Sequence, residues 1–345
     1  NFGNSMSKIF ILYFIFVQSI VLCAQSPESL RFAFYNVENL FDTIDDVRIS
    51  DEEFLPNGSR FWNSRKYQSK LSAISKTIVG IQGWQNLGMI ALAEIENQRV
   101  LEDLVSRPEL KKQKLKIIHK DSPDRRGIDI GIIYNPQFIE IKKIDFIPLK
   151  DSLFPKLKSR DMVYVKVKIF EDYELHFFAC HWPSRYGGQV KSEPKRILAA
   201  KILRAYVDSI QEIDSLANIL IMGDFNDEWT NKSLRQYLRA QKPSEATNGS
   251  NLLNLMSSLP LEFGSHKYQG EWAYLDQIIV NHSLMNLNSQ GLKIENFEVL
   301  ELPFLLEEDL KYLGLKPNRT YNGFKYNGGF SDHLAIFADL TLIKL

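Results

Sequence analysis

Cysteine is scarce in this chain of 345 residues, which contains only Cys23 and Cys180. A structural zinc site needs Cys and His ligands at short spacings, and the chain has no such pattern. Cys180 lies inside an apolar strand-like segment, where alternation turns the neighbouring His181 to the other face. We therefore interpret Cys180 as a small buried core residue and not as a nucleophile. If Cys23 leaves with the N-terminal segment described below, no intrachain disulfide can form.

Charge of one sign is not in excess either, because 42 Lys and Arg residues stand against 42 Asp and Glu residues. A net charge of +0 gives no global field that would attract nucleic acid. The sequence also shows no basic stripe with interleaved aromatic residues, no internal repeat and no low-complexity tract. These absences disfavour a tight duplex-binding protein, since such binding draws on several Lys or Arg contacts to phosphates.

The first 24 residues have the anatomy of a secretory signal peptide. Lys8 lies in a short basic region, an apolar stretch covers residues 9–23, and Ala24 precedes Gln25. This pattern predicts cleavage after Ala24 and an exported protein, periplasmic or extracellular. The apolar stretch is short for a membrane span, which disfavours an uncleaved anchor. Leu22 disfavours a lipid anchor on Cys23, and residues 1–5 are expected to be an extension before an initiator at Met6.

In two segments of the sequence, an apolar run lies next to polar side chains. In ILIMGDFND, a buried strand-like run from Ile219 to Met222 leads to Asp224 and Asn226; in SDHLAIFADL, Asp332 and His333 precede a C-terminal strand. Residues two apart at a strand end can point the same way. A carboxylate, an amide and an imidazole are suited to hydrolysis of a phosphate ester. Taken singly, each segment fits an ordinary turn after a buried strand as well as it fits a catalytic role.

Four further segments follow the same pattern. Asn36 lies in FAFYNVENLF, Glu94 in MIALAEIEN, His181 in HFFACHWPSRYGG and Asp276 in WAYLDQIIVN. Glu94 ends a wholly apolar strand, which is a costly place for an acid that binds nothing.

With these motifs in this order, residues 31–345 resemble the endonuclease/exonuclease/phosphatase superfamily. That group includes pancreatic deoxyribonuclease, apurinic endonucleases, inositol polyphosphate 5-phosphatases and neutral sphingomyelinases. The segments NVENLFDT, HWPSR and DQIIV look most like those of secreted bacterial members. The resemblance implies a deoxyribonuclease I-like α/β (α+β) fold: a four-layer sandwich of two mainly antiparallel or mixed β-sheets flanked by helices. Because the motifs are spread along the chain, we expect a single domain over residues 28–345.

The resemblance implies a site for Mg²⁺ or Mn²⁺. Glu94 is the expected metal ligand, with Asn36 orienting it or contacting the metal shell, and Asp332 as a second ligand. Hard divalent cations prefer such oxygen ligands. Glu96 competes with Glu94, since strand alternation puts both on one side and only the family register favours Glu94.

The catalytic residues implied by the resemblance are His333, Asp276, Asp224, His181 and Asn226. His333 and Asp276 look like a His–carboxylate pair, in which the carboxylate fixes the imidazole tautomer. Asp224 would hold or deprotonate the attacking water. Asn226, His181 and Arg185 would bind the substrate phosphate, and a guanidinium suits this role through its paired donors.

Periodicity predicts helices around Tyr67–Ile78, Val100–Leu104 and Ile197–Ile210, with strands at 129–134, 162–169 and 175–181. Residues 300–329 are expected to form a long loop or helical insertion at the site rim. KKQKLKIIHK reads as a solvated edge strand. We interpret His119, His176, His266 and His282 as surface or structural, and Arg126 and Asp129 mainly as a turn and strand start.

The motifs say little about what is esterified to the phosphate. We expect first an extracellular endonuclease or phosphodiesterase that cleaves nucleic acid as a monomer, without a stable protein partner. A phosphatase or a phosphodiesterase of inositol phosphates or phospholipids is the alternative, and a non-catalytic binding protein on the same scaffold is a third. The complete set of site residues argues against the third.

Overall fold

The computed structural model describes residues 29–246, 252–260, 262–285 and 291–344. The expected signal peptide, with Cys23 and Met6, lies outside these described residues. Within them, no helix is both long enough and apolar enough to cross a membrane.

The first half of the fold is a six-stranded sheet in the order β14–β19–β1–β2–β4–β3. Its strands are β1 (Ser29–Leu40), β2 (Asn86–Ile95), β3 (Lys116–Ile118), β4 (Asp129–Tyr134), β14 (Gly291–Val299) and β19 (Ile336–Ile343). β1 runs parallel to β2, while the remaining pairs are antiparallel. β3 lies at the sheet edge, as expected for the lysine-rich run that contains it.

The second half is a seven-stranded sheet in the order β5–β6–β7–β8–β13–β10–β9. Its strands are β5 (Glu140–Ile147), β6 (Met162–Ile169), β7 (Tyr173–His181), β8 (Ile219–Asp224), β9 (Ala240–Gln241), β10 (Leu252–Asn254) and β13 (Asp276–Val280). β7 and β8 are parallel, and β13 runs antiparallel to β8.

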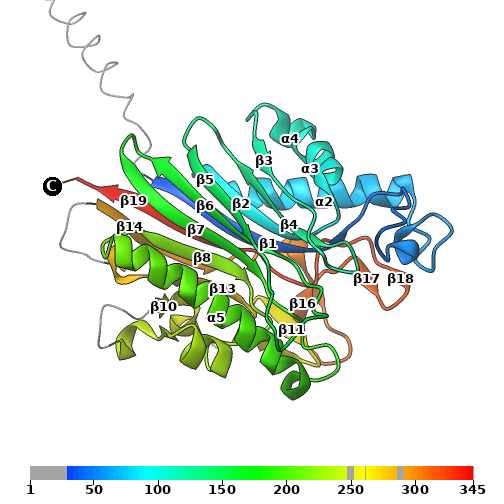
Figure 1. Ribbon diagram of the computed structural model, residues 1–345. Helices are drawn as coiled ribbons and strands as arrows, with labels where there is room; N and C mark the ends of the chain where they lie inside the picture. The colour runs from blue at the N-terminus through cyan, green and yellow to red at the C-terminus, as the bar shows by residue number, and fades with distance from the viewer. Residues whose placement is uncertain (1–28, 247–251, 261, 286–290, 345) are drawn as a thin grey trace, which may run out of the picture.

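Helices cover the outer faces of the two sheets (Figure 1). They are α2 (Ser64–Gln82), α3 (Gln98–Val105) and α4 (Pro108–Lys111) on the six-stranded side, and α5 (Gln189–Ile213) with a π-helical turn (Ser233–Tyr237) on the other. Short 3-10 turns occupy 52–54, 243–245, 255–258, 282–285 and 303–305. α2 begins at an Asn63 cap, whose side chain accepts from the Lys66 amide, and ends at Gly83 with a φ of 54°. The two mixed sheets with their flanking helices confirm the predicted fold class.

The core fills the space between the sheets and the space under α5. Phe32 of β1 and Phe177 of β7 meet there, with ring centroids 5.9 Å apart. A separate cluster joins the outer face of the seven-stranded sheet to Leu203 and Val207 of α5. Cys180 is fully buried in this second cluster, as predicted.

The segment 300–329 differs from the expected long loop or helical insertion. Apart from one short turn it forms two small antiparallel hairpins, β15–β16 (Leu306–Glu308 and Leu315–Pro317) and β17–β18 (Tyr321–Asn322 and Lys325–Tyr326). Another hairpin, β11–β12 (His266–Tyr268 and Glu271–Ala273), lies just before β13. These hairpins are too short to give a clear alternating pattern in the sequence.

Candidate active site

One cleft of about 840 Å³ collects almost all of the predicted site residues. The carboxyl ends of β1, β2, β7 and β8 supply some of them, and the segment before β19 supplies others. The cleft is lined by the predicted residues Asn36, Glu94, His181, Arg185, Asp224, Asn226, Asp332 and His333. Asp276 does not line the cleft and is fully buried behind His333.

His333 and Asp276 form a close pair, with 2.7 Å between Nδ1 of His333 and Oδ2 of Asp276. The backbone amides of the two residues are fixed by hydroxyls, since Ser331 accepts from His333 and Ser265 accepts from Asp276. Burial alone would lower the pKa of His333, but the charges of Asp276 and Asp224 raise it well above its usual value. This geometry holds the imidazole in one orientation with Nε2 toward the cleft.

Asp224 stands at the centre of the site. Its Oδ2 accepts from Asn36 Nδ2 at 3.1 Å, and its Oδ1 accepts from the Asn226 amide at 2.8 Å. The same Oδ2 lies 3.8 Å from His333 Nε2. Burial raises the pKa of Asp224 to about 7, although the charge of His333 opposes this shift. A carboxylate with such a pKa is suited to accept a proton near neutral pH.

His181 lies on the other side of Asp224. Its Nε2 is 3.6 Å from Asp224 Oδ2 and 4.0 Å from Glu94 Oε1. Burial lowers the pKa of His181 well below its usual value, and the nearby charges of Arg160 and Arg126 add to this. The ring is therefore neutral at neutral pH and offers a single N–H donor.

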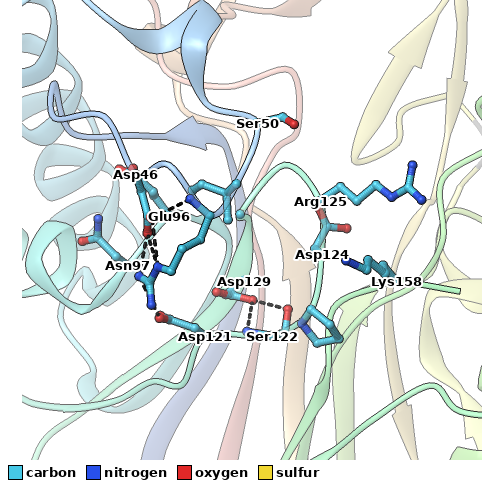
Figure 2. A pocket seen from close by; sticks show the side chains of 14 residues that line it. Asp46, Ser50, Glu96, Asn97, Asp121, Ser122, Asp124, Arg125, Asp129 and Lys158 are labelled. Carbon is cyan, nitrogen blue, oxygen red and sulfur yellow. Dashed lines mark hydrogen bonds and ion pairs between the residues drawn. The ribbon is translucent and has the colours of Figure 1, made fainter. Parts of the chain in front are cut away.

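A β-bulge separates Glu94 from its competitor Glu96. Glu94 has a φ of 64°, and the register of β2 against β4 shifts between Ala93 and Ile95. The side chain of Glu94 lines the catalytic cleft, where its Oε2 accepts from the Asn39 amide at 3.0 Å. Glu96 instead lines a different hollow, shown in Figure 2, and burial raises its pKa to about 8. Simple alternation, which puts both acids on one side, was therefore wrong here.

Asp332 is paired with a residue that the sequence reasoning did not identify. Arg319, from the segment between β16 and β17, donates from Nη2 to Asp332 Oδ2 at 2.9 Å and to Glu38 Oε1 at 2.8 Å. Burial would raise the pKa of Asp332, but the charge of Arg319 lowers it below its usual value. Buried Lys70 of α2 donates to Thr320 and to the Phe330 carbonyl, and it supports this arrangement from behind.

Asn226, on the loop after β8, contacts Arg185, on the loop between β7 and α5. Asn226 has a φ of 51°, and its side-chain amide donates to the Trp182 carbonyl at 3.1 Å. Arg185 donates from Nε to the Asn226 carbonyl at 2.7 Å, and its Nη2 lies 3.7 Å from Asp227. Arg185 thus supports the Asn226 loop as well as lining the cleft.

The structure brings two more residues into the cleft. His266 of β11 was interpreted as surface or structural, yet it lines the cleft with its ring centroid 4.7 Å from that of His333. Arg126, from the turn before β4, lines the cleft as well. Burial lowers the pKa of His266 to about 4, and the charge of His333 adds to this shift. The contact of His266 with His333 depends on the β11–β12 hairpin, whose strands are too short to show an alternating pattern in the sequence.

The donor atoms facing the cleft fit a hard divalent cation. Glu94, Asp332 and Asp224 offer carboxylate oxygens, and Asn36 offers an amide. Two groups of side chains at the site have potential ligand atoms within 4.8 Å of one another, and each includes imidazole nitrogen: His266 with Asp332 and His333, and Asp224 with Asp276 and His333. The carboxylate and amide oxygens of Glu94, Asp332, Asp224 and Asn36 are of the kind that Mg²⁺ and Mn²⁺ prefer.

The family model described as the Endonuclease/Exonuclease/phosphatase family matches residues 31–342 of the chain. No curated protein matches the chain by sequence.

Solved structures with the same fold cover nearly the whole chain. A mannosyl-6-phosphatase from Bacteroides thetaiotaomicron is 14% identical, with a TM-score of 0.57 over 91% of this chain and 100% of that one. The human Nocturnin catalytic domain, solved with a sulfate anion, is 14% identical, with a TM-score of 0.56 over 93% and 97%. D. rerio TDP2, solved with a single-strand DNA product, is 12% identical, with a TM-score of 0.53 over 91% and 99%. At these identities the likeness concerns the fold.

Proposed function

The chain belongs to the endonuclease/exonuclease/phosphatase family, a group of metal-dependent phosphoesterases, and we propose that it is an exported phosphodiesterase that cleaves nucleic acid. One observation carries the proposal of a hydrolase. Asp224, with its pKa raised to about 7, stands within 4 Å of both His181 and His333 at the end of a cleft lined by further carboxylates. A base, proton donors and an oxygen-rich cation site are thereby gathered around one point.

The proposed reaction is in-line attack of water on a phosphodiester: a P–O bond to the water oxygen forms, the P–O bond to the leaving oxygen breaks, and the leaving oxygen takes up a proton from solvent. Mg²⁺ or Mn²⁺ held by Glu94, Asn36 and Asp332 would supply charge stabilisation for the phosphoryl group when bound. Asp224 would orient the water and take its proton, since its pKa lies near the working pH.

The remaining residues would bind the phosphate and the leaving oxygen. His333 would present its Nε2 proton to the phosphate while Asp276 holds the ring at Nδ1. Neutral His181 would donate a hydrogen bond from Nε2 to a phosphate oxygen or to the leaving oxygen. Asn226 from the loop after β8 and Arg185 from the loop after β7 would bind the phosphate, and Arg319 adds another guanidinium in the cleft.

Nucleic acid is favoured as substrate by two exposed aromatic side chains at the cleft. Tyr186 is 93% exposed and Tyr268 is 67% exposed, and both line the cleft. Exposed aromatic rings beside a phosphate site are suited to stack on unpaired bases. The single-strand DNA product bound to D. rerio TDP2 supports this choice. Phosphomonoester hydrolysis is the alternative, and the likeness to a mannosyl-6-phosphatase supports it.

A substrate panel tests the proposal. The mature protein with Mg²⁺ or Mn²⁺ is assayed against plasmid, single-stranded DNA, RNA, bis-nitrophenyl phosphate, inositol phosphates, mannose 6-phosphate and sphingomyelin. We expect hydrolysis of bis-nitrophenyl phosphate and of at least one polynucleotide. Hydrolysis of monoesters or phospholipid head groups alone would refute the nuclease assignment and leave a phosphatase or phospholipid phosphodiesterase.

A further inference from the structure

A second hollow, of about 500 Å³, gathers four cationic side chains: Arg125, Lys156, Lys158 and Lys195. We call these four residues and the space between them the basic hollow. They come from the turn before β4, the segment between β5 and β6, and the second turn of α5. The fold brings these three segments together, and for this reason no basic stripe is visible in the sequence.

None of these four cations forms an ion pair with a described carboxylate. All four are exposed, and among the described residues none has a carboxylate oxygen within 4.0 Å. Two neighbouring acids have other partners: Asp124 pairs with Arg160 at 3.1 Å, and Glu193 pairs with Lys232 at 3.7 Å. The chain as a whole has no net charge, so the positive potential of these four cations is local. Salt screens it beyond roughly one Debye length, about 8–10 Å.

The basic hollow and the catalytic cleft are lined by neighbouring residues of the same segments. Arg125 directly precedes Arg126, which lines the cleft, so one turn borders both spaces. On the opposite side, α5 begins at Gln189 in the cleft and reaches Lys195 after six residues, about 9 Å along the helix axis. Arg125 and Lys158 also line the hollow that contains Glu96, and Figure 2 shows them together at one side of it, away from Asp46 and Glu96.

We propose that the basic hollow binds the backbone phosphates of a nucleic acid strand that extends out of the catalytic cleft. Four unpaired cations around one hollow beside a phosphodiester site are complementary to a polymer of phosphates. A sugar phosphate or a mononucleotide would occupy the cleft alone and would leave these cations without a ligand. The inference rests on the proposed function and specifies its substrate as a polynucleotide several residues long.

The test compares two triple variants in a catalytically blocked His333→Ala background. One removes the hollow's lysines through Lys156→Ala, Lys158→Ala and Lys195→Ala. The matched control removes three exposed lysines from the edge-strand run through Lys111→Ala, Lys112→Ala and Lys116→Ala. Binding of a labelled single-stranded oligonucleotide of about 20 nucleotides is followed by fluorescence anisotropy between 50 and 200 mM salt, the range over which phosphate contacts weaken. Melting curves verify that both proteins are folded.

Loss of the hollow's lysines is expected to raise the oligonucleotide Kd about 10-fold or more at 50 mM salt and to reduce the salt slope by about 2, for three lost contacts. The control variant is expected to keep the parent Kd and slope. Unchanged binding in the hollow variant would overturn the proposal. So would a hollow variant that loses affinity for phosphatidylserine-containing vesicles but not for the oligonucleotide, since this would identify a membrane surface.

A separate assay of catalysis distinguishes failure of the proposed function from failure of the proposed strand binding. With His333 restored, the hollow variant should hydrolyse bis-nitrophenyl phosphate at the parent rate, because this small diester needs only the cleft. An intact protein that fails to hydrolyse any phosphodiester would refute the proposed function, and the anisotropy result would still show whether the hollow binds a strand.

Discussion

His333 and Asp276 join the two sheets at their catalytic end through the 2.7 Å contact between Nδ1 and Oδ2. His333 precedes β19 of the six-stranded sheet, and Asp276 begins β13 of the seven-stranded sheet. A second contact of the same kind links Asn36 of β1 to Asp224 of β8 at 3.1 Å. The site therefore depends on how the two sheets pack, as well as on local strand ends.

Replacing Asp276 by Asn should lower kcat by up to about 10⁴, because an amide cannot fix the His333 tautomer in the same way. His333→Ala should cost a comparable amount. Turnover of bis-nitrophenyl phosphate measures both, with circular dichroism to verify folding. Asp172→Asn, at a carboxylate that is 88% exposed on the β6–β7 turn, is the matched control. A nearly silent Asp276→Asn would show that this assignment is wrong.

Arg319 should contribute to catalysis through its position between Glu38 and Asp332. We expect Arg319→Ala to reduce kcat/KM by about 10²–10³, as for loss of one donor to a reacting oxygen. Arg319→Lys should recover only part of this, since an ammonium lacks the paired donors of a guanidinium. The surface variant Arg235→Ala serves as a control. If Arg319→Ala keeps the parent kinetics, the residue only anchors its loop.

Stability should fall in mild acid because of His176, which shares a 2.8 Å hydrogen bond with the hydroxyl of Tyr164. Burial lowers the pKa of His176 to about 4. The folded pKa thus lies below the unfolded value of about 6.5, and stability is lost as pH falls from about 6.5 towards 4.

His176→Gln should reduce the difference in unfolding free energy between pH 7 and pH 5 by at most about 1 kcal/mol, after allowing for solvent screening. Urea titrations at the two pH values measure this difference. An identical pH dependence in the parent and the variant would contradict the role given to His176.

Export is predicted from residues 1–24, which lie outside the described structure. Expressed in its host, the protein should begin near Gln25 and be recovered outside the cytoplasm. N-terminal sequencing of the purified protein decides the point. A cytosolic product that still begins at Met6 would contradict it.

Local patterns in the sequence predicted the residues at strand ends, and the family resemblance carried by those patterns predicted the fold class. The runs before Asp224 and Glu94 are wholly apolar and stop at a polar residue, so both strand and site signals are contained within a few residues. The helical face of Tyr67, Leu71, Ile74 and Ile78 is likewise local, and all four residues are buried in α2 as predicted.

Features that depend on tertiary contacts could not be predicted in this way. The bulge at Glu94 reverses the alternation argument, and nothing in the sequence of an apolar strand marks it. His266 reaches the cleft from a short hairpin, and Arg319 from the segment between two others, and these residues have no clear period in the sequence. The basic hollow combines three segments that are far apart in the chain.

The central claim is that the cleft is a metal-dependent phosphodiesterase site, and a chelation assay tests it most directly. The rate of bis-nitrophenyl phosphate and oligonucleotide hydrolysis is measured for the mature protein in EDTA and again after Mg²⁺ or Mn²⁺ is restored in excess. We predict that activity disappears in EDTA and returns with either ion, and that Asp224→Ala remains inactive throughout. Full activity in the presence of the chelator would contradict the account.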